Sequence, residues 1–177
     1  AIMIPIAWGS LAYRITRRLA LAMMRLFAFL RARPEDLEAV VIWGDKQLSR
    51  MHRLAPWLFR YSIPKGIGVT VYDLEFPSPL LISSYKLELD VLKTYLDMGA
   101  GSAIFKTIMK NKRAGNARPR MQDIKMEGVP SLVNAVGLPG PGIHGYLRSI
   151  EPFVKNADRP IGFSIGGDSV DDYFQVF

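Results

Sequence analysis

Gly140, Gly142 and Gly145 stand at the G-x-G-x-x-G spacing of a dinucleotide-binding loop. In such a loop, backbone N–H groups at the start of a helix hold a pyrophosphate, and a carboxylate ending the next strand holds the ribose. Pro139 and Pro141 remove two of these N–H donors, and the next strand-like segment, PIGFSIGG, ends in glycines. The chain therefore departs from a dinucleotide fingerprint. The alternative hypothesis is that this glycine and proline loop brings its backbone close to a flat ligand.

Polar side chains end two apolar segments that precede this loop. Lys106 and Thr107 end the strand-like segment SAIFKT, where a lysine is consistent with an ordinary strand-end cation or with a partner for developing negative charge. Asn134 offers both a donor and an acceptor, which suits the imide edge of a ring and equally suits a turn cap. His52 and His144 fall within helical segments, where we expect structural roles, with His52 exposed or capping.

The composition excludes several classes of site. The 177 residues are 49% hydrophobic and 22% charged, which is typical of a folded protein with one good core. Cysteine is absent and the two histidines are widely separated, so neither a disulfide nor a metal site is expected. The net charge of +7 is concentrated at the N-terminus. All the arginines of that region precede the first acidic residue, Glu35, and they are Arg14, Arg17, Arg18, Arg25, Arg31 and Arg33.

Residues 1–64 are expected to form a helical region. Residues 13–30 place arginines on one arc of a helix and apolar residues opposite, which predicts a basic amphipathic helix. Such a helix either packs on its own protein or lies at a membrane interface, flanked by Trp8 and Tyr13, and its apolar face disfavours nucleic acid. Residues 1–13 are apolar but too short to cross a bilayer, which takes about 20 residues. A second helix is expected from Pro34 to residue 42 and again over 46–59, with a kink at Pro56.

Residues 65–177 have the pattern of an α/β domain. GVTVYDLEF predicts a hairpin with Tyr72 and Asp73 in its turn, and PLLISS predicts a buried strand. ELDVLKTYLDMG and IHGYLRSIEPFV have helical spacing, SAIFKT and PIGFSIGG are strand-like, and a last helix begins at Asp168 or Ser169. This alternation predicts a parallel sheet. The basic loop MKNKRAGNARPRM is expected to be solvated.

The ordered segments VTVYDLEFPSPLLISS, GAGSAIFKT, GNARPRM, NAVGLPGPG and PIGFSIGG resemble the N-terminal half of the dihydroorotate dehydrogenase family. The resemblance begins near Gly68 and implies an α/β fold that is part of a TIM-type (β/α) barrel with FMN as cofactor, preceded by the amphipathic helical region. It implies a substrate, dihydroorotate or a related pyrimidine, that is oxidised to orotate in pyrimidine biosynthesis. The helical extension resembles the membrane-bound, quinone-reducing members, whereas FKT and NAVGLP are more similar to the soluble ones. We therefore expect residues 1–33 to contact the cytoplasmic side of a membrane, with a quinone as acceptor.

The resemblance also implies the residues of the site. Lys106 would be the catalytic cation and would contact both substrate and flavin, with Thr107 and Ser84 as further flavin contacts. The remaining substrate-binding residues would be Asn134, Val136, Gly137 and Leu138. No metal ligand is implied.

The sequence departs from the family pattern at two places. Tyr85 stands where the family has a glycine beside the flavin, and Gly140 stands where it commonly has an asparagine. The family's general base, a serine or cysteine on a later loop, and its main phosphate-binding strands are expected beyond Phe177. Residues 65–177 suffice for only part of a barrel of about 250 residues. Two hypotheses follow: an FMN-dependent enzyme, or a short non-catalytic relative that serves as an accessory or structural subunit of a larger membrane complex.

Overall fold

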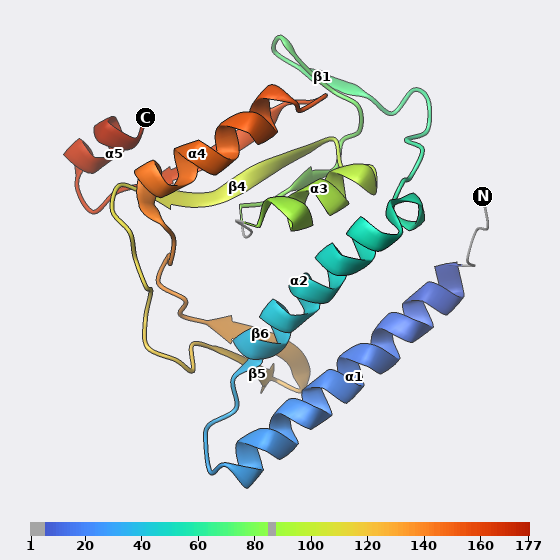
Figure 1. Cartoon of the computed structure of the whole chain (residues 1–177), viewed down its shortest axis with the longest axis vertical. Coiled ribbons are helices and arrows are strands. Elements are labelled where there is room, and N and C mark those ends of the chain that lie inside the picture. The colour runs from blue at the N-terminus through green and yellow to red at the C-terminus, as the bar shows by residue number, and fades with distance from the viewer. Residues whose placement is uncertain (1–5, 85–87) are drawn as a thin grey trace. The chain divides into compact units, whose positions relative to one another are not determined.

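The computed structural model describes residues 6–84 and 88–177, which form two compact units (Figure 1). The first unit contains the described part of Ala1–Gly44 together with Asn116–Val136. The second contains the described part of Asp45–Gly115 together with Gly137–Phe177. The boundary expected between residues 64 and 65 falls inside the second unit.

Two helices open the chain. Helix α1 (Ile6–Leu30) confirms the predicted amphipathic helix and begins earlier than expected, and α2 (Leu37–Leu54) follows it. The expectation of a break at Gly44 is wrong, because one glycine in a helix interior costs only about 1 kcal/mol and the helix runs through it. Pro34 precedes the helix rather than entering its first turn, and the Asp36 carboxylate caps it by accepting a hydrogen bond from the Glu38 N–H at 3.1 Å. Pro56 opens the short 3-10 helix η1 (Pro56–Leu58) instead of kinking a longer helix.

An antiparallel hairpin completes the first unit. Strands β5 (Met121–Met126) and β6 (Val129–Asn134) pair in a register that joins Met121 to Asn134. Glu127 and Gly128 form its turn with φ values of 50° and 82°, the left-handed conformation that suits a tight hairpin. The segment that contains Asn134 therefore belongs to a two-stranded sheet of its own and does not pair with the strand that contains Lys106.

The arginines that follow Asn116 are ion-paired rather than solvated, which corrects the expectation for the basic loop. Arg120 binds Glu38 through two parallel hydrogen bonds, Nε to Oε2 at 2.7 Å and Nη2 to Oε1 at 2.8 Å. Arg118 binds Asp36 at 2.6 Å. The first turn of α2 is thereby tied to the hairpin by planar guanidinium–carboxylate pairs.

The second unit is built on the expected parallel sheet. Its strands lie in the order β3-β4-β7, with β3 at Leu81–Ile82, β4 at Ser102–Met109 and β7 at Ile161–Gly166. Helices α3 (Leu89–Asp97), α4 (Gly142–Lys155) and α5 (Val170–Val176) alternate with these strands, and α3 and α4 both pack on β4 (Figure 1). Ser169 caps α5 by accepting a hydrogen bond from the Asp172 N–H. The prediction of a strand–helix alternation with parallel pairing is confirmed.

The core of the second unit lies between this sheet and its helices. Phe105 of β4 is fully buried, stacks on Phe163 of β7 at 5.3 Å between ring centroids, and meets the edge of Phe153 of α4 at 5.6 Å. The hairpin of β1 (Val69–Val71) and β2 (Leu74–Phe76) precedes the sheet, and Tyr72 takes a φ of 55° in its turn. The predicted position of that turn is confirmed.

His52 is buried, which corrects the expectation that it would be exposed or capping. Its side chain on α2 is 8% exposed, and Nε2 lies 2.7 Å from Oδ2 of Asp97 at the end of α3. Phe59 contacts the imidazole edge-on at 5.6 Å. A buried polar group must be satisfied, and this carboxylate satisfies the histidine within the second unit.

Candidate functional site

A β-bulge in β4 distinguishes the centre of the parallel sheet. Phe105 pairs with Phe163, but the next register pair joins Ile108 to Ile165, so two residues of β4 lie opposite one residue of β7. Phe105 and Ile108 both belong to the buried core, although an unbroken strand would direct residues three apart to opposite faces. The extra residue shifts the alternation by one, which is how a bulge re-aims side chains.

The two residues in the bulge are Lys106 and Thr107, which the sequence singled out. Both side chains are half-buried, and the single residue opposite them is Ser164 of β7. Thr107 Oγ1 lies 3.0 Å from Ser164 Oγ. The bulge thus places Lys106 and Thr107 opposite Ser164 in the second half of these strands, toward the carboxyl ends at which α/β barrels build their sites.

Small residues on β7 shape the surface beside Thr107. A Cβ added to Gly166 would lie 2.8 Å from Thr107 Cγ2, and one added to Gly162 would lie 3.0 Å from Ile104 Cγ1. Gly162, Ser164 and Gly166 alternate along the strand, so their α-carbons present one face. The sequence predicted PIGFSIGG to be a strand and assigned no site residue to it. The period-two run of small residues was the signal that could have identified Ser164.

The remaining predicted residues lie in different parts of the molecule. Ser84 is half-buried in the turn after β3, and Tyr85 lies outside the described residues. Asn134 and Val136 belong to the first unit, whereas Gly137 and Leu138 belong to the second, with φ values of 75° and 49°. The structure brings Lys106 and Thr107 together with Ser164, and the convergence of Asn134 on Lys106 stays a prediction.

The G-x-G-x-x-G segment has a structural reason for its glycines. Gly142 has a φ of 76°, and a Cβ there would lie 2.8 Å from the carbonyl carbon of Asn111 and from the amide nitrogen of Lys112. Gly140 exchanges two backbone hydrogen bonds with Arg113, at 2.9 and 3.0 Å. This loop packs its backbone against the loop that follows β4, and only glycine allows that approach at the start of α4.

Charged residues link the loops that follow β4 and β7. Lys110 Nζ lies 3.1 Å from Asp172 Oδ1, and Arg113 binds Asp168. The hydrogen bond from Lys110 lowers the pKa of the Asp172 carboxyl below its ordinary value. Asp168 lies in the loop after β7 and Asp172 in the first turn of α5, so these pairs hold the loop after β4 to the segment that follows β7.

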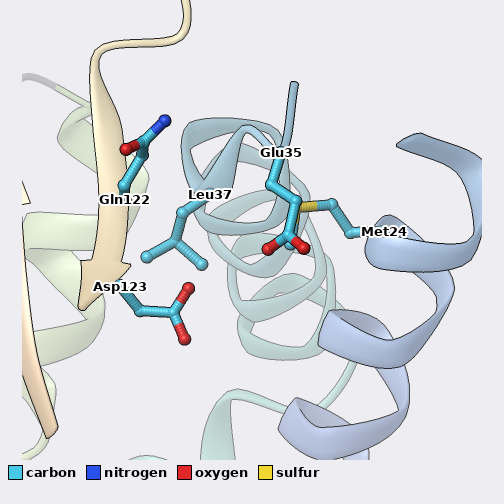
Figure 2. Close-up of a pocket in the computed structure, with 5 residues that line it drawn as sticks. All are labelled: Met24, Glu35, Leu37, Gln122 and Asp123. Atoms are coloured by element: carbon cyan, nitrogen blue, oxygen red, sulfur yellow. The ribbon is translucent and has the colours of Figure 1, made fainter. Parts of the chain in front are cut away.

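The first unit has a pocket that the sequence did not indicate. Figure 2 shows the Leu37 side chain beside the carboxylates of Glu35 and Asp123; the full lining is Met24, Glu35, Leu37, Gln122 and Asp123. Arg25 binds both carboxylates, with Nε 3.2 Å from Glu35 and Nη2 2.8 Å from Asp123. In the described part of the chain, no three histidine, aspartate or glutamate side chains are grouped to hold a metal ion.

The sequence profile described as dihydroorotate dehydrogenase matches residues 67–177. The catalytic subunit of dihydroorotate dehydrogenase B (NAD(+)) from Desulforudis audaxviator is 35% identical over 111 residues, which are 62% of this chain and 35% of that protein. The subunit of the same description from Thermotoga maritima is 31% identical over 104 residues, 58% of this chain and 36% of that one. The chain spans about a third of the length of these curated relatives.

A solved structure supports the fold. The ligand-free dihydroorotate dehydrogenase of Eimeria tenella superposes with a TM-score of 0.56 at 18% identity, covering 73% of this chain and 39% of that one. The similarity agrees with an incomplete TIM-type fold, because the parallel strands that the structure describes form an open sheet of three.

Proposed function

Because the chain belongs to the dihydroorotate dehydrogenase family, we propose that it takes part in oxidising dihydroorotate to orotate through FMN, in pyrimidine biosynthesis. The observation that carries the proposal is the β4 bulge, which gathers Lys106, Thr107 and Ser164 at the face where a barrel enzyme binds its cofactor.

The chemistry of this face fits the ring of FMN. A flavin presents carbonyl oxygens and ring nitrogens along its pyrimidine edge, and an ammonium with two hydroxyls supplies donors for them. The glycines of β7 make room for side chains of β4, since a Cβ on Gly166 would lie 2.8 Å from both Thr107 Cγ2 and Met109 Sδ. Lys106, Thr107 and Ser84 would hold the ring in this arrangement. When bound, FMN would supply the hydride acceptor.

We assign substrate binding to Lys106 and to the segment that runs from Asn134, the last residue of β6, to Leu138. The Lys106 ammonium would pair with the carboxylate of dihydroorotate and stabilise negative charge beside it. Asn134 would bind the imide edge of the pyrimidine with its amide, and Val136, Gly137 and Leu138 would contribute backbone groups.

We also propose association with the cytoplasmic side of a membrane through residues 1–33, with a quinone as acceptor. The support is α1, which carries arginines on one arc while Leu19, Phe27 and Leu30 are 60%, 50% and 66% exposed. An exposed apolar face beside cationic side chains suits an interface with anionic lipid. No helix in the described residues is long and apolar enough to cross a bilayer.

A second function is a non-catalytic subunit of a larger membrane complex. It is favoured by α5, where Val170 is 71% exposed and Phe174 is 77% exposed. Exposed large apolar side chains on one short helix are a surface that another protein would cover.

An absorption spectrum of the purified protein separates the two functions. Enzyme function predicts a yellow protein that dihydroorotate bleaches, and Lys106→Ala is expected to weaken bleaching at least tenfold. Lys93→Ala removes an exposed lysine of α3 and serves as the matched control. A colourless protein that takes up no added FMN would contradict the enzyme function and favour the subunit. Sedimentation with anionic and neutral vesicles tests the membrane contact, and equal recovery with both would contradict it.

A further inference from the structure

The hydroxyl of Thr107 is held by β7 through one hydrogen bond, since Oγ1 lies 3.0 Å from Ser164 Oγ. The glycine at position 166 leaves space for the methyl group, because a Cβ there would lie 2.8 Å from Thr107 Cγ2. Threonine is branched at Cβ and has few χ1 rotamers, so this bond and this space together favour one of them. The side chain is thereby fixed before any ligand binds.

The bulge is what brings the two hydroxyls together. If the register of Phe105 with Phe163 continued unbroken, Lys106 would lie opposite Ser164 and Thr107 would face the core with Phe105. The extra residue moves Thr107 to the face of β7 that carries Ser164. In a hydrogen bond between two hydroxyls, one O–H donates to the oxygen of the other. The accepting hydroxyl can then donate its own hydrogen to a third group.

We propose that Ser164 is a positioning residue that acts through Thr107. Ser164 donates to Thr107 Oγ1, and this bond directs the Thr107 hydrogen toward a hydrogen-bond acceptor on the edge of the flavin ring. Donation into Thr107 also polarises its own O–H, which strengthens the outgoing bond. The inference rests on the proposed function, because the acceptor is part of FMN.

The test compares FMN binding by the flavin-free protein and three variants, measured by quenching of flavin fluorescence. Ser164→Ala is expected to weaken binding about three- to tenfold, the size of one neutral hydrogen bond. Thr107→Val keeps the shape of the side chain, removes its hydroxyl and is expected to weaken binding at least as much. Ser164→Thr keeps a hydroxyl and is expected to restore most of the affinity.

The double variant decides whether Ser164 acts through Thr107. If it does, Ser164→Ala adds no further loss in a Thr107→Val background, because the bond it supports is already gone. Additive losses would mean that Ser164 contacts the ligand by itself, and they would overturn the inference. The visible absorption maximum of bound flavin should shift in the two single variants that lose a hydroxyl, a change that a general loss of stability would not produce.

Ser149→Ala on α4 is the matched control, since it makes the same substitution away from the sheet. If the wild-type protein and Ser164→Ala bind FMN equally well, the inference is overturned and the proposed function is unaffected. Wild-type protein that binds no FMN would overturn both. If Ser164→Ala does not fold, Ser164→Cys tests the same bond, because a thiol is a weaker donor than a hydroxyl and should also weaken FMN binding; unchanged affinity of that variant would overturn the inference.

Discussion

Replacing Tyr146 with phenylalanine is expected to stabilise the protein. Tyr146 lies on α4 within the core of the second unit and is 4% exposed. Among the residues that the structure describes, its hydroxyl has no hydrogen-bond partner. A buried hydroxyl that loses water without gaining a partner costs about 1–3 kcal/mol. Phenylalanine fills the same volume without this cost, so Tyr146→Phe should raise the free energy of unfolding by about 1 kcal/mol.

The pH dependence of unfolding gives the same side chain a second, independent readout. Burial, with a smaller contribution from Glu88, raises the pKa of the Tyr146 phenol. Above about pH 10 the unfolded phenol ionises while the folded one stays protonated, so the unfolded state gains stability as the pH rises. The free energy of unfolding is therefore unaffected by this titration below about pH 10 and falls above it, at up to about 1.4 kcal/mol per pH unit. Tyr146→Phe should lose less stability over this alkaline range than the wild type does.

Urea unfolding followed by circular dichroism, at neutral and alkaline pH, measures both effects. Tyr72→Phe is the matched control, because Tyr72 is 98% exposed and its hydroxyl is already in water. Its free energy of unfolding should change by less than about 0.5 kcal/mol. A decrease of about 1 kcal/mol for Tyr146→Phe would refute the reasoning, since it would mean that the hydroxyl makes a stabilising bond in the folded protein.

Three further substitutions test other contacts. Gly142→Ala should lower the free energy of unfolding by at least about 2 kcal/mol, because the residue has a φ of 76° and its Cβ would lie 2.8 Å from backbone atoms of the loop after β4; an unchanged urea midpoint would contradict this. Arg120→Gln should lower the free energy of unfolding by about 2 kcal/mol. The side chains of Arg120 and Glu38 are only 11% and 13% exposed, and the substitution removes the bidentate partner of the Glu38 carboxylate. Additive effects of Arg120→Gln and Glu38→Gln would argue against an interaction between the two residues. Asp172→Asn should flatten the loss of thermal stability between about pH 5 and pH 2. The Lys110 hydrogen bond lowers the pKa of the Asp172 carboxyl, so the stability that it contributes is present above the ordinary pKa and lost as the pH falls below it; parallel melting profiles for variant and wild type would exclude that contribution.

Much of the fold follows from local patterns in the sequence. The helix over residues 13–30 could be predicted because its period repeats within a few turns, and the turn at Tyr72 could be predicted because neighbouring strands alternate on either side of it. The order of strands and helices after residue 68 indicated a parallel sheet for the same reason. These features depend on residues that are close in sequence.

The burial of His52 could not be predicted in this way. Its partner, Asp97, is 45 positions further along the chain, and the pair forms only once α2 and α3 are packed together. The start of α2 is set by local residues, yet its predicted position was wrong. Pro34 was expected in the first turn, whereas the helix begins at Leu37 and Asp36 caps it, because proline suits positions both just before and just inside a helix.

Residue types alone determined that this chain could form an α/β domain with Lys106 and Thr107 near the end of one of its strands. Tertiary structure decided what those residues contact. The bulge that places Thr107 beside Ser164 depends on the register between β4 and β7, and these two residues are 57 positions apart in the sequence. Register is set by the packing of Phe105, Ile108 and their partners into one core, and a shift of a single residue sends every later side chain to the opposite face. The chemistry available at the site therefore depends on pairing between distant strands, which no local pattern encodes.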